Sequence, residues 1–100
     1  MTEAGKPARI VIEAASRPTL ARHIKMRHDA ARDRWVLLAP ERVFTPDAIA
    51  VAVLQLCDGN RTVETVAAEL ARAYNAPKEQ ILVDVVSLLQ GLADKGVVKA

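Results

Sequence analysis

Apolar and polar side chains alternate in the first half of the chain, as they do in half-buried strands. From residue 23 to residue 28 the alternation would place Lys25 and Arg27 on one face of a strand and Ile24 and Met26 on the other. Residues 35–39 are apolar at every position, which is typical of a central strand covered on both faces. These two segments predict a small antiparallel sheet.

A third strand is predicted at the edge of this sheet. It consists of Arg42, Val43 and Phe44, and it lies between Pro40 and Pro46. Proline cannot donate a hydrogen bond to a ladder, so short strands bounded by prolines are typical of sheet edges. Near the C-terminus, residues 97–99 are expected to return as a last short strand.

Three helices are predicted between the edge strand and the last strand. Thr45-Pro46-Asp47 offers a capping residue, a proline suited to the first helical position and an acid in the first turn, so the first helix would cover residues 46 to about 57. Thr62 would cap a helix that ends near residue 74, and a third helix would run from residue 77 to about 95, closed by Gly96. The predicted class is α+β: a small N-terminal antiparallel sheet of about three strands, followed by a three-helix bundle in a winged helix-turn-helix-like arrangement.

The third predicted helix has a wider apolar face than its own core requires. At about 100° per residue its apolar side chains fill roughly 160°, whereas a surface helix needs roughly 100° to face a core. The excess consists of Leu82, Val86, Leu89 and Ala93. Either the sheet covers this arc within the domain, or the arc forms one wall of a groove.

The first 17 residues differ in composition from the rest of the chain. They contain Gly5, Pro7 and several small residues around one apolar run, Ile10-Val11-Ile12. We therefore predict a flexible N-terminal arm or linker over residues 1–17 and a folded domain over residues 18–100.

Composition narrows the class of protein. The chain has 100 residues, of which 51% are hydrophobic, and it contains one cysteine. A domain of this size has little room for both a substrate cleft and a catalytic constellation. One cysteine excludes an internal disulfide, and no apolar run approaches the roughly 18 residues that span a membrane. We expect a cytoplasmic protein that does not interact with membranes.

The residue types needed for catalysis or metal binding do not occur in useful patterns. His23 and His28 differ in parity on their strand, so they would point to opposite faces. Cys57 ends an apolar helix stripe, as a small buried hydrophobe does. The sequence has no phosphate loop, dinucleotide fingerprint, paired-carboxylate motif or serine elbow. We predict that the protein is not an enzyme and binds no metal or cofactor.

Charge is distributed unevenly along the chain. Residues 1–45 carry nine Lys and Arg against five Asp and Glu, net +4, whereas residues 46–100 carry five against seven, net −2. The exposed side of the third helix has Glu79, Asp84 and Asp94 against Lys95, and these acids would repel a DNA backbone. Nucleic acid is therefore not the expected partner, and a winged-helix DNA-binding regulator remains only as the alternative interpretation.

The edge strand and the excess arc together suit a peptide-binding site. An edge strand can be extended by an added strand, and apolar pockets beside it would give selectivity. The predicted site residues are Arg42, Val43, Phe44, Leu82, Val86, Leu89 and Ala93, with Lys25 and Arg27 steering an acidic peptide electrostatically. From the residues alone, a second interpretation is equally good: the arc belongs to the core, and the chain's own N-terminal arm caps the edge strand.

Several segments follow one another in an order that resembles a known family. They are Arg17-Pro18, residues 35–41 with Thr45-Pro46, Leu56-Cys57-Asp58-Gly59 with Arg61-Thr62-Val63, and residues 92–98. Together they resemble the PqqD family of pyrroloquinoline quinone biosynthesis over residues 17–98. The Leu-Cys-Asp-Gly run before Arg-Thr-Val is the most specific part of the resemblance.

The resemblance implies a peptide chaperone with the fold of the recognition elements of ribosomally synthesised, modified peptides. Such proteins bind the precursor peptide PqqA and present it to the radical S-adenosylmethionine enzyme PqqE, which crosslinks a glutamate and a tyrosine of the peptide. The peptide is expected to add to the third strand and to lie against the last helix. Fusion to, or association with, PqqC is a further implication, and it would suit a linker over residues 1–17.

Overall fold

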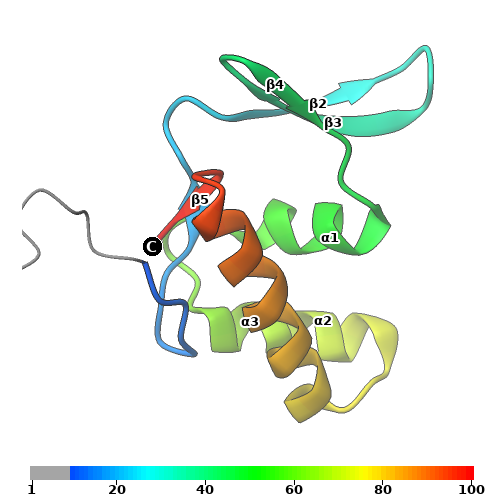
Figure 1. The fold of residues 1–100 in the computed structure, drawn as a ribbon. Coiled ribbons are helices and arrows are strands. Elements are labelled where there is room, and N and C mark those ends of the chain that lie inside the picture. Colours follow the sequence, from blue (N-terminus) through cyan, green and yellow to red (C-terminus); the bar gives the residue numbers. More distant parts are fainter. Residues whose placement is uncertain (1–9) are drawn as a thin grey trace, which may run out of the picture.

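The computed structural model describes residues 10–100 and has the α+β class expected from the sequence. A small antiparallel sheet precedes three helices, as predicted (Figure 1). In chain order the elements are β1 (Thr19–Leu20), β2 (Lys25–Asp29), β3 (Arg34–Ala39), β4 (Arg42–Phe44), α1 (Ala48–Leu56), α2 (Val63–Tyr74), α3 (Lys78–Asp94) and β5 (Val98–Lys99).

The strands form two antiparallel sheets. One has the order β2-β3-β4, so β3 is central and β4 is an edge, as predicted. In this sheet Leu37 lies opposite Met26 on one side and opposite Phe44 on the other. The second sheet pairs β1 with β5 and places Thr19 opposite Lys99. The last strand was expected from the sequence, but its partner β1 was not, because two residues are too few to show an alternation.

Only one face of the three-stranded sheet is covered. Leu37 is 1% exposed and belongs to the core, and Met26 and Phe44 pack against that core. Val36 and Leu38 point to the other face and lie outside the core cluster. The prediction that β3 is covered on both faces is therefore wrong for the outer face, because the helices lie on one side of the sheet (Figure 1).

The helix boundaries follow the capping residues. α1 begins two residues later than predicted, because Asp47 is the N-cap and its Oδ1 accepts a hydrogen bond from the backbone N–H of Ala50 at 2.8 Å. Thr45 and Pro46 therefore precede the helix. α2 begins after Thr62, as predicted, and the Thr62 side chain accepts a hydrogen bond from the backbone N–H of Thr65 at 3.1 Å.

Residues 10–17 lie against the helices. Ile12 is 4% exposed and belongs to the core cluster. The amide of Gln90 on α3 accepts a hydrogen bond from the N–H of Ile12 at 2.8 Å and donates one to the carbonyl of Ile10 at 2.7 Å. On the α2 side, the N–H of Val63 donates to the carbonyl of Ser16 at 2.8 Å. The predicted domain boundary at residue 18 therefore separates Ile12 from the other residues of the same core.

The first nine residues lie outside the described part of the chain. The assignment of residues 1–17 to a flexible arm or linker therefore stays a prediction. Across residues 10–100, no helix is both long enough and apolar enough to cross a bilayer.

Candidate peptide-binding site

A cleft lies between the edge strand β4 and the helix α3. Phe44 lines one side of this β4–α3 cleft, Leu88 and Leu92 line the other, and Lys95 lies at its α3 C-terminal end. The cleft has a volume of about 250 Å³. Apolar side chains therefore line the cleft together with the polar residues Thr45, Asp47 and Lys95.

The free side of β4 offers unpaired backbone groups. Within residues 10–100, β4 pairs only with β3, and Ala39 lies opposite Arg42 across a two-residue turn. A two-residue turn is closed by a hydrogen-bonded pair, and hydrogen-bonded and non-hydrogen-bonded pairs alternate along an antiparallel ladder. Val43, opposite Leu38, is therefore at a non-hydrogen-bonded position. Its N–H and C=O point toward the open edge, where an added strand would meet them.

The structure brings together only part of the predicted site. Arg42, Val43 and Phe44 form the edge strand, as expected. Leu82 and Val86, however, line a separate groove of about 640 Å³ on α3. At 100° per residue, Leu88 lies about 200° from Val86 around the helix, so this groove and the β4–α3 cleft are on opposite sides of α3.

The other two predicted residues of α3 face inward. Leu89 is 0% exposed, so it has no surface that a peptide could touch in this structure. Ala93 is partly buried and packs against the core cluster. The role of these α3 residues in peptide binding stays a prediction. The groove of Leu82 and Val86 also includes Gln90, the residue that holds Ile10 and Ile12.

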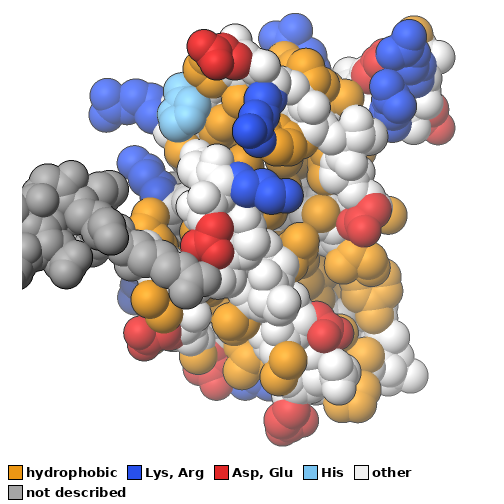
Figure 2. Space-filling view, in the orientation of Figure 1, with side chains coloured by type: hydrophobic (Ala, Val, Ile, Leu, Met, Phe, Trp, Pro, Cys, Tyr) orange, Lys and Arg blue, Asp and Glu red, His pale blue; other side chains and the backbone are white. Residues whose placement is uncertain are grey.

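Lys25 and Arg27 lie on the outer face of the sheet. Lys25 is opposite Leu38, in the same row as Val43, and Arg27 is opposite Val36. Both cations therefore flank the exposed side of the sheet instead of the β4–α3 cleft. Figure 2 shows most basic side chains in the upper half of the molecule, where the strands lie, whereas acidic ones occur both beside the sheet and over the helices below. This distribution gives no support to DNA binding by the helices, and the steering role of the two cations stays a prediction.

Periodicity does not single out Leu88, Leu92 and Lys95 as lining residues of the cleft. Leu88 and Leu92 are four residues apart and lie within the apolar arc of α3, outside the excess part that predicts a groove. Lys95 lies on the exposed side of the predicted helix, among acidic residues. The width of the arc correctly predicts an apolar surface on α3, but periodicity does not show which edge of the arc the sheet approaches.

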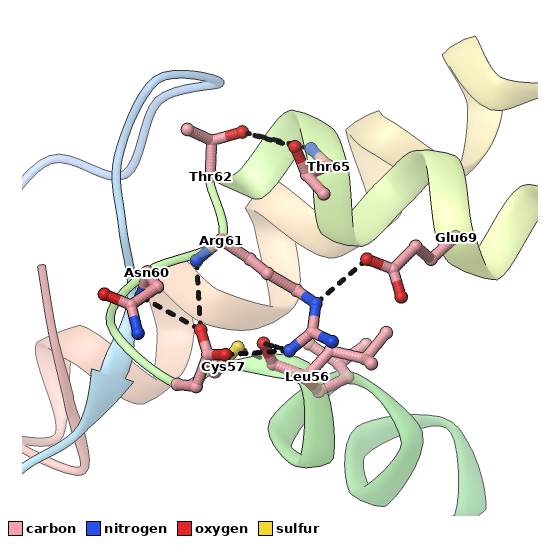
Figure 3. Close-up of polar contacts among 9 residues, drawn as sticks. Leu56, Cys57, Asn60, Arg61, Thr62, Thr65 and Glu69 are labelled. Carbon is pink, nitrogen blue, oxygen red and sulfur yellow. Dashed lines mark hydrogen bonds and ion pairs between the residues drawn. The ribbon is translucent and has the colours of Figure 1, made fainter.

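The loop between α1 and α2 holds the most specific segment of the family resemblance, and its polar groups serve the fold (Figure 3). The carboxylate of Asp58 accepts hydrogen bonds from the N–H groups of Asn60 at 2.9 Å and Arg61 at 3.0 Å. The Arg61 side chain pairs with Asp58 at 2.8 Å and with Glu69 of α2 at 2.9 Å. The backbone hydrogen bonds hold the pKa of Asp58 below its usual value.

Cys57 and His28, two titratable residues singled out in the sequence, make local contacts. Cys57 is buried, and its Sγ donates to the carbonyl of Val53 at 3.2 Å. His28 pairs with Asp33 at 3.2 Å on the exposed β2–β3 turn. Among residues 10–100, no cluster of three or more His, Cys, Asp or Glu side chains could hold a metal ion.

Comparison with known proteins assigns the family. Residues 34–98 match the family model described as coenzyme PQQ synthesis protein D (PqqD). The chain belongs to the PqqD family. A curated relative from Bradyrhizobium diazoefficiens, named PqqA binding protein, is 57% identical over 90 residues, which are 90% of this chain and 87% of the relative. A relative of the same name from Xanthomonas euvesicatoria is 46% identical over 80% of this chain and 87% of the relative.

Two solved PqqD structures are similar to this chain. The solution NMR structure of the PqqD truncation of Methylobacterium extorquens PqqCD has a TM-score of 0.77 and 42% identity, covering 89% of this chain and 95% of that one. It is described as a functional, stand-alone recognition element of ribosomally synthesised and post-translationally modified peptides. The crystal structure of PqqD from Xanthomonas campestris has a TM-score of 0.53 and 36% identity, covering 95% of this chain and 93% of that one. The resemblance drawn from the sequence is confirmed.

Proposed function

We propose that this protein binds the ribosomal precursor peptide PqqA as an added strand on β4 and presents it to the radical S-adenosylmethionine enzyme PqqE. The observation that carries the proposal is the open edge at Val43, which lies next to the apolar β4–α3 cleft. Relatives that share up to 57% of their residues with this chain are named PqqA binding proteins. The protein would act in the cytoplasm, where its peptide is made.

Strand addition divides recognition between backbone and side chains. The peptide backbone would pair with the N–H and C=O of Val43, which gives affinity without regard to sequence. Because side chains alternate along a strand, every second peptide side chain would enter the cleft against Phe44, Leu88 and Leu92. Selectivity would then come from the shape and charge of the cleft.

In this proposal the protein contributes proximity and no chemistry of its own. A small domain that holds the peptide and also docks the enzyme raises the local peptide concentration, to about the millimolar range for short tethers. Association with PqqC belongs to the same proposal, since the Methylobacterium extorquens neighbour is a truncation of a PqqCD protein.

Two substitutions at one position test the strand addition. Val43→Pro removes the N–H that faces the open edge, and proline is tolerated at an edge where its nitrogen points away from the ladder. We expect the Kd for PqqA, measured by calorimetry, to rise roughly tenfold. Val43→Ala keeps the N–H and trims a side chain that is 66% exposed, so its Kd should stay within about twofold of wild type.

The same pair of variants tests presentation to the enzyme. At a peptide concentration below the wild-type Kd, crosslinking by PqqE should slow with the proline variant and not with the alanine variant. Equal Kd values for the two variants, with both chains folded by circular dichroism, would contradict pairing at this edge. Unchanged crosslinking with the proline variant, despite weaker peptide binding, would contradict presentation.

A further inference from the structure

A second pocket adjoins the β4–α3 cleft along α3. This anchor pocket has a volume of about 260 Å³ and is enclosed by apolar residues of all three helices, among them Val53, Leu70 and Val85. Asp47 and Leu88 line both the anchor pocket and the β4–α3 cleft, so the two hollows are adjacent. An apolar cavity of roughly 150 Å³ already holds a benzene ring, so the anchor pocket is large enough for an aliphatic or aromatic side chain.

The rim of the anchor pocket is unusually apolar for an exposed surface. Ile49 is 56% exposed and Tyr74 is 53% exposed, and both line the pocket. In Figure 2, hydrophobic and acidic side chains are interspersed on the side of the molecule where α1 begins and α2 ends. Apolar side chains gathered around a hollow are typical of a surface that receives a ligand.

The α3 wall of the combined cleft has a cation at one end and a carboxylate at the other. Lys95 lines the β4–α3 cleft and Asp84 lines the anchor pocket, 11 positions earlier. That separation brings the two residues to within about 20° of each other around the helix and about 16 Å apart along it. Opposite α3, Asp47 lines both hollows, and Arg42 lies beside the lining residue Phe44, with its guanidinium carbon 5.8 Å from the ring centre.

Internal ion pairs do not neutralise these four charges. Within residues 10–100, the ion pairs involve other residues: His28 with Asp33, Arg61 with Asp58 and Glu69, and Lys78 with Glu64. Asp84 accepts only from the neutral amide of Gln80, at 3.2 Å, and Asp47 caps α1. The cations at one end and the carboxylates at the other are therefore available to a ligand.

We infer that the anchor pocket holds an apolar side chain of the same precursor peptide, and that the charged ends fix the direction in which the peptide binds. This inference rests on the proposed function. An acidic peptide residue would lie near Arg42 and Lys95, and a basic one near Asp47 and Asp84. A strand rises about 3.3 Å per residue, so a span of about 16 Å places the two charged residues about five positions apart, with apolar residues between them.

The shared lining favours the peptide as the occupant over a separate partner. A strand paired with Val43 would lie beside the β4–α3 cleft, and a further apolar side chain of the same peptide could pass Leu88, which lines both hollows, and enter the anchor pocket. In the reversed direction each charged peptide residue would face a like charge, which is unfavourable.

Charge reversal at each end tests the polarity. Asp84→Lys and Lys95→Glu should each raise the Kd for PqqA about threefold to tenfold at low ionic strength, and the effect should shrink at about 0.5 M salt. Glu79→Lys makes the same charge change on α3, at an exposed residue that lines neither hollow, and should leave the Kd within about twofold. The double variant Asp84→Lys/Lys95→Glu should lose the preference for PqqA over a synthetic PqqA in which acidic and basic residues have exchanged places, because Arg42 and Asp47 keep their charges.

Tyr74 provides a direct readout of the anchor pocket. It is the one tyrosine of the chain, so in isotopically labelled protein its ring resonances are unambiguous, and they should shift when unlabelled PqqA is added. An unmoved Tyr74 ring, or charge reversals that bind PqqA like wild type, would overturn the inference. If Val43→Pro still weakened binding in that case, the proposed function would stand alone. Failure of the wild-type protein to bind PqqA would overturn both.

Discussion

Cys57 shows how burial decides the chemistry of a single residue. Its side chain is 6% exposed at the end of α1, and its Sγ donates to a carbonyl of the same helix. Burial, and to a lesser degree the charge of Asp58, raises the pKa of the Cys57 thiol to about 11. The thiolate is the form that attacks substrates and binds metals, and at neutral pH this residue is a thiol. Its interpretation as a small buried hydrophobe is confirmed.

The raised pKa predicts a loss of stability in alkaline solution. Between pH 9 and pH 11 the unfolded chain loses the Cys57 proton while the folded chain keeps it. The contribution of Cys57 to the free energy of unfolding is therefore complete below pH 9 and is lost as the pH approaches 11. The free energy of unfolding should fall by roughly 1–3 kcal/mol more for wild type than for Cys57→Ala over this range. Urea denaturation at pH 8 and pH 10.5 measures the difference. Parallel losses in the two proteins would show that other groups cause them.

The N-terminal strap, residues 10–17, is an element that periodicity does not reveal. Its backbone hydrogen bonds go to Gln90 and to the first turn of α2, and Ile12 enters the core. A polar side chain on the outer surface of a helix gives no sign in the sequence that it will bind an extended segment about 80 positions away. The strap can therefore be recognised only in the structure and not in the sequence.

Gln90 should stabilise the protein through the strap. Gln90→Ala removes two hydrogen bonds to the backbone, at Ile12 and Ile10, and should lower the free energy of unfolding by about 1–2 kcal/mol. The amide hydrogen of Ile12 should also exchange faster. Gln80→Ala is the matched control, because the Gln80 amide reaches only Asp84 on the same helix. Equal urea midpoints for the two variants would mean that the Gln90 hydrogen bonds add nothing measurable to the stability of the strap.

α3 illustrates how far the sequence determines the candidate site. Its length and its wide apolar arc follow from the spacing of its aliphatic residues, and β4 follows from its flanking prolines. The placement of β4 beside α3 does not follow from these local patterns, because it depends on how the sheet packs over α1 and α3. Phe44 faces Leu88 and Leu92 across the β4–α3 cleft, whereas Leu82 and Val86 line a groove on the far side of the helix. Local patterns thus predict the surfaces, and tertiary packing decides which surfaces meet.

On the scale of the whole molecule, the three-stranded sheet is attached to the helices through few side chains. Leu37, Met26 and Phe44 reach the core, while the outer face, with Val43 at 66% exposure, has no helix over it. In Figure 1 the sheet stands apart from the helical layer and joins it through the connections to β1 and α1. A layer with so little buried apolar area is expected to open more readily than the helices.

Hydrogen exchange should report this difference in stability. We expect amides of β2, β3 and β4 to exchange faster than those in the buried parts of α2 and α3, such as Val66 and Leu89. Added PqqA should slow exchange in β4, because a paired strand covers its open edge. Uniform exchange across sheet and helices would show instead that the protein opens as one unit.

β1 bears on how the chain reaches this fold. It pairs with β5 across 80 positions, and the residue before it, Pro18, accepts a hydrogen bond from Gly59 in the middle of the chain. The free energy of these contacts is gained only after the loop-closure entropy of nearly the whole polypeptide has been lost. Contacts of such long sequence separation slow folding. We therefore expect the pairing of β1 with β5 to form late in folding.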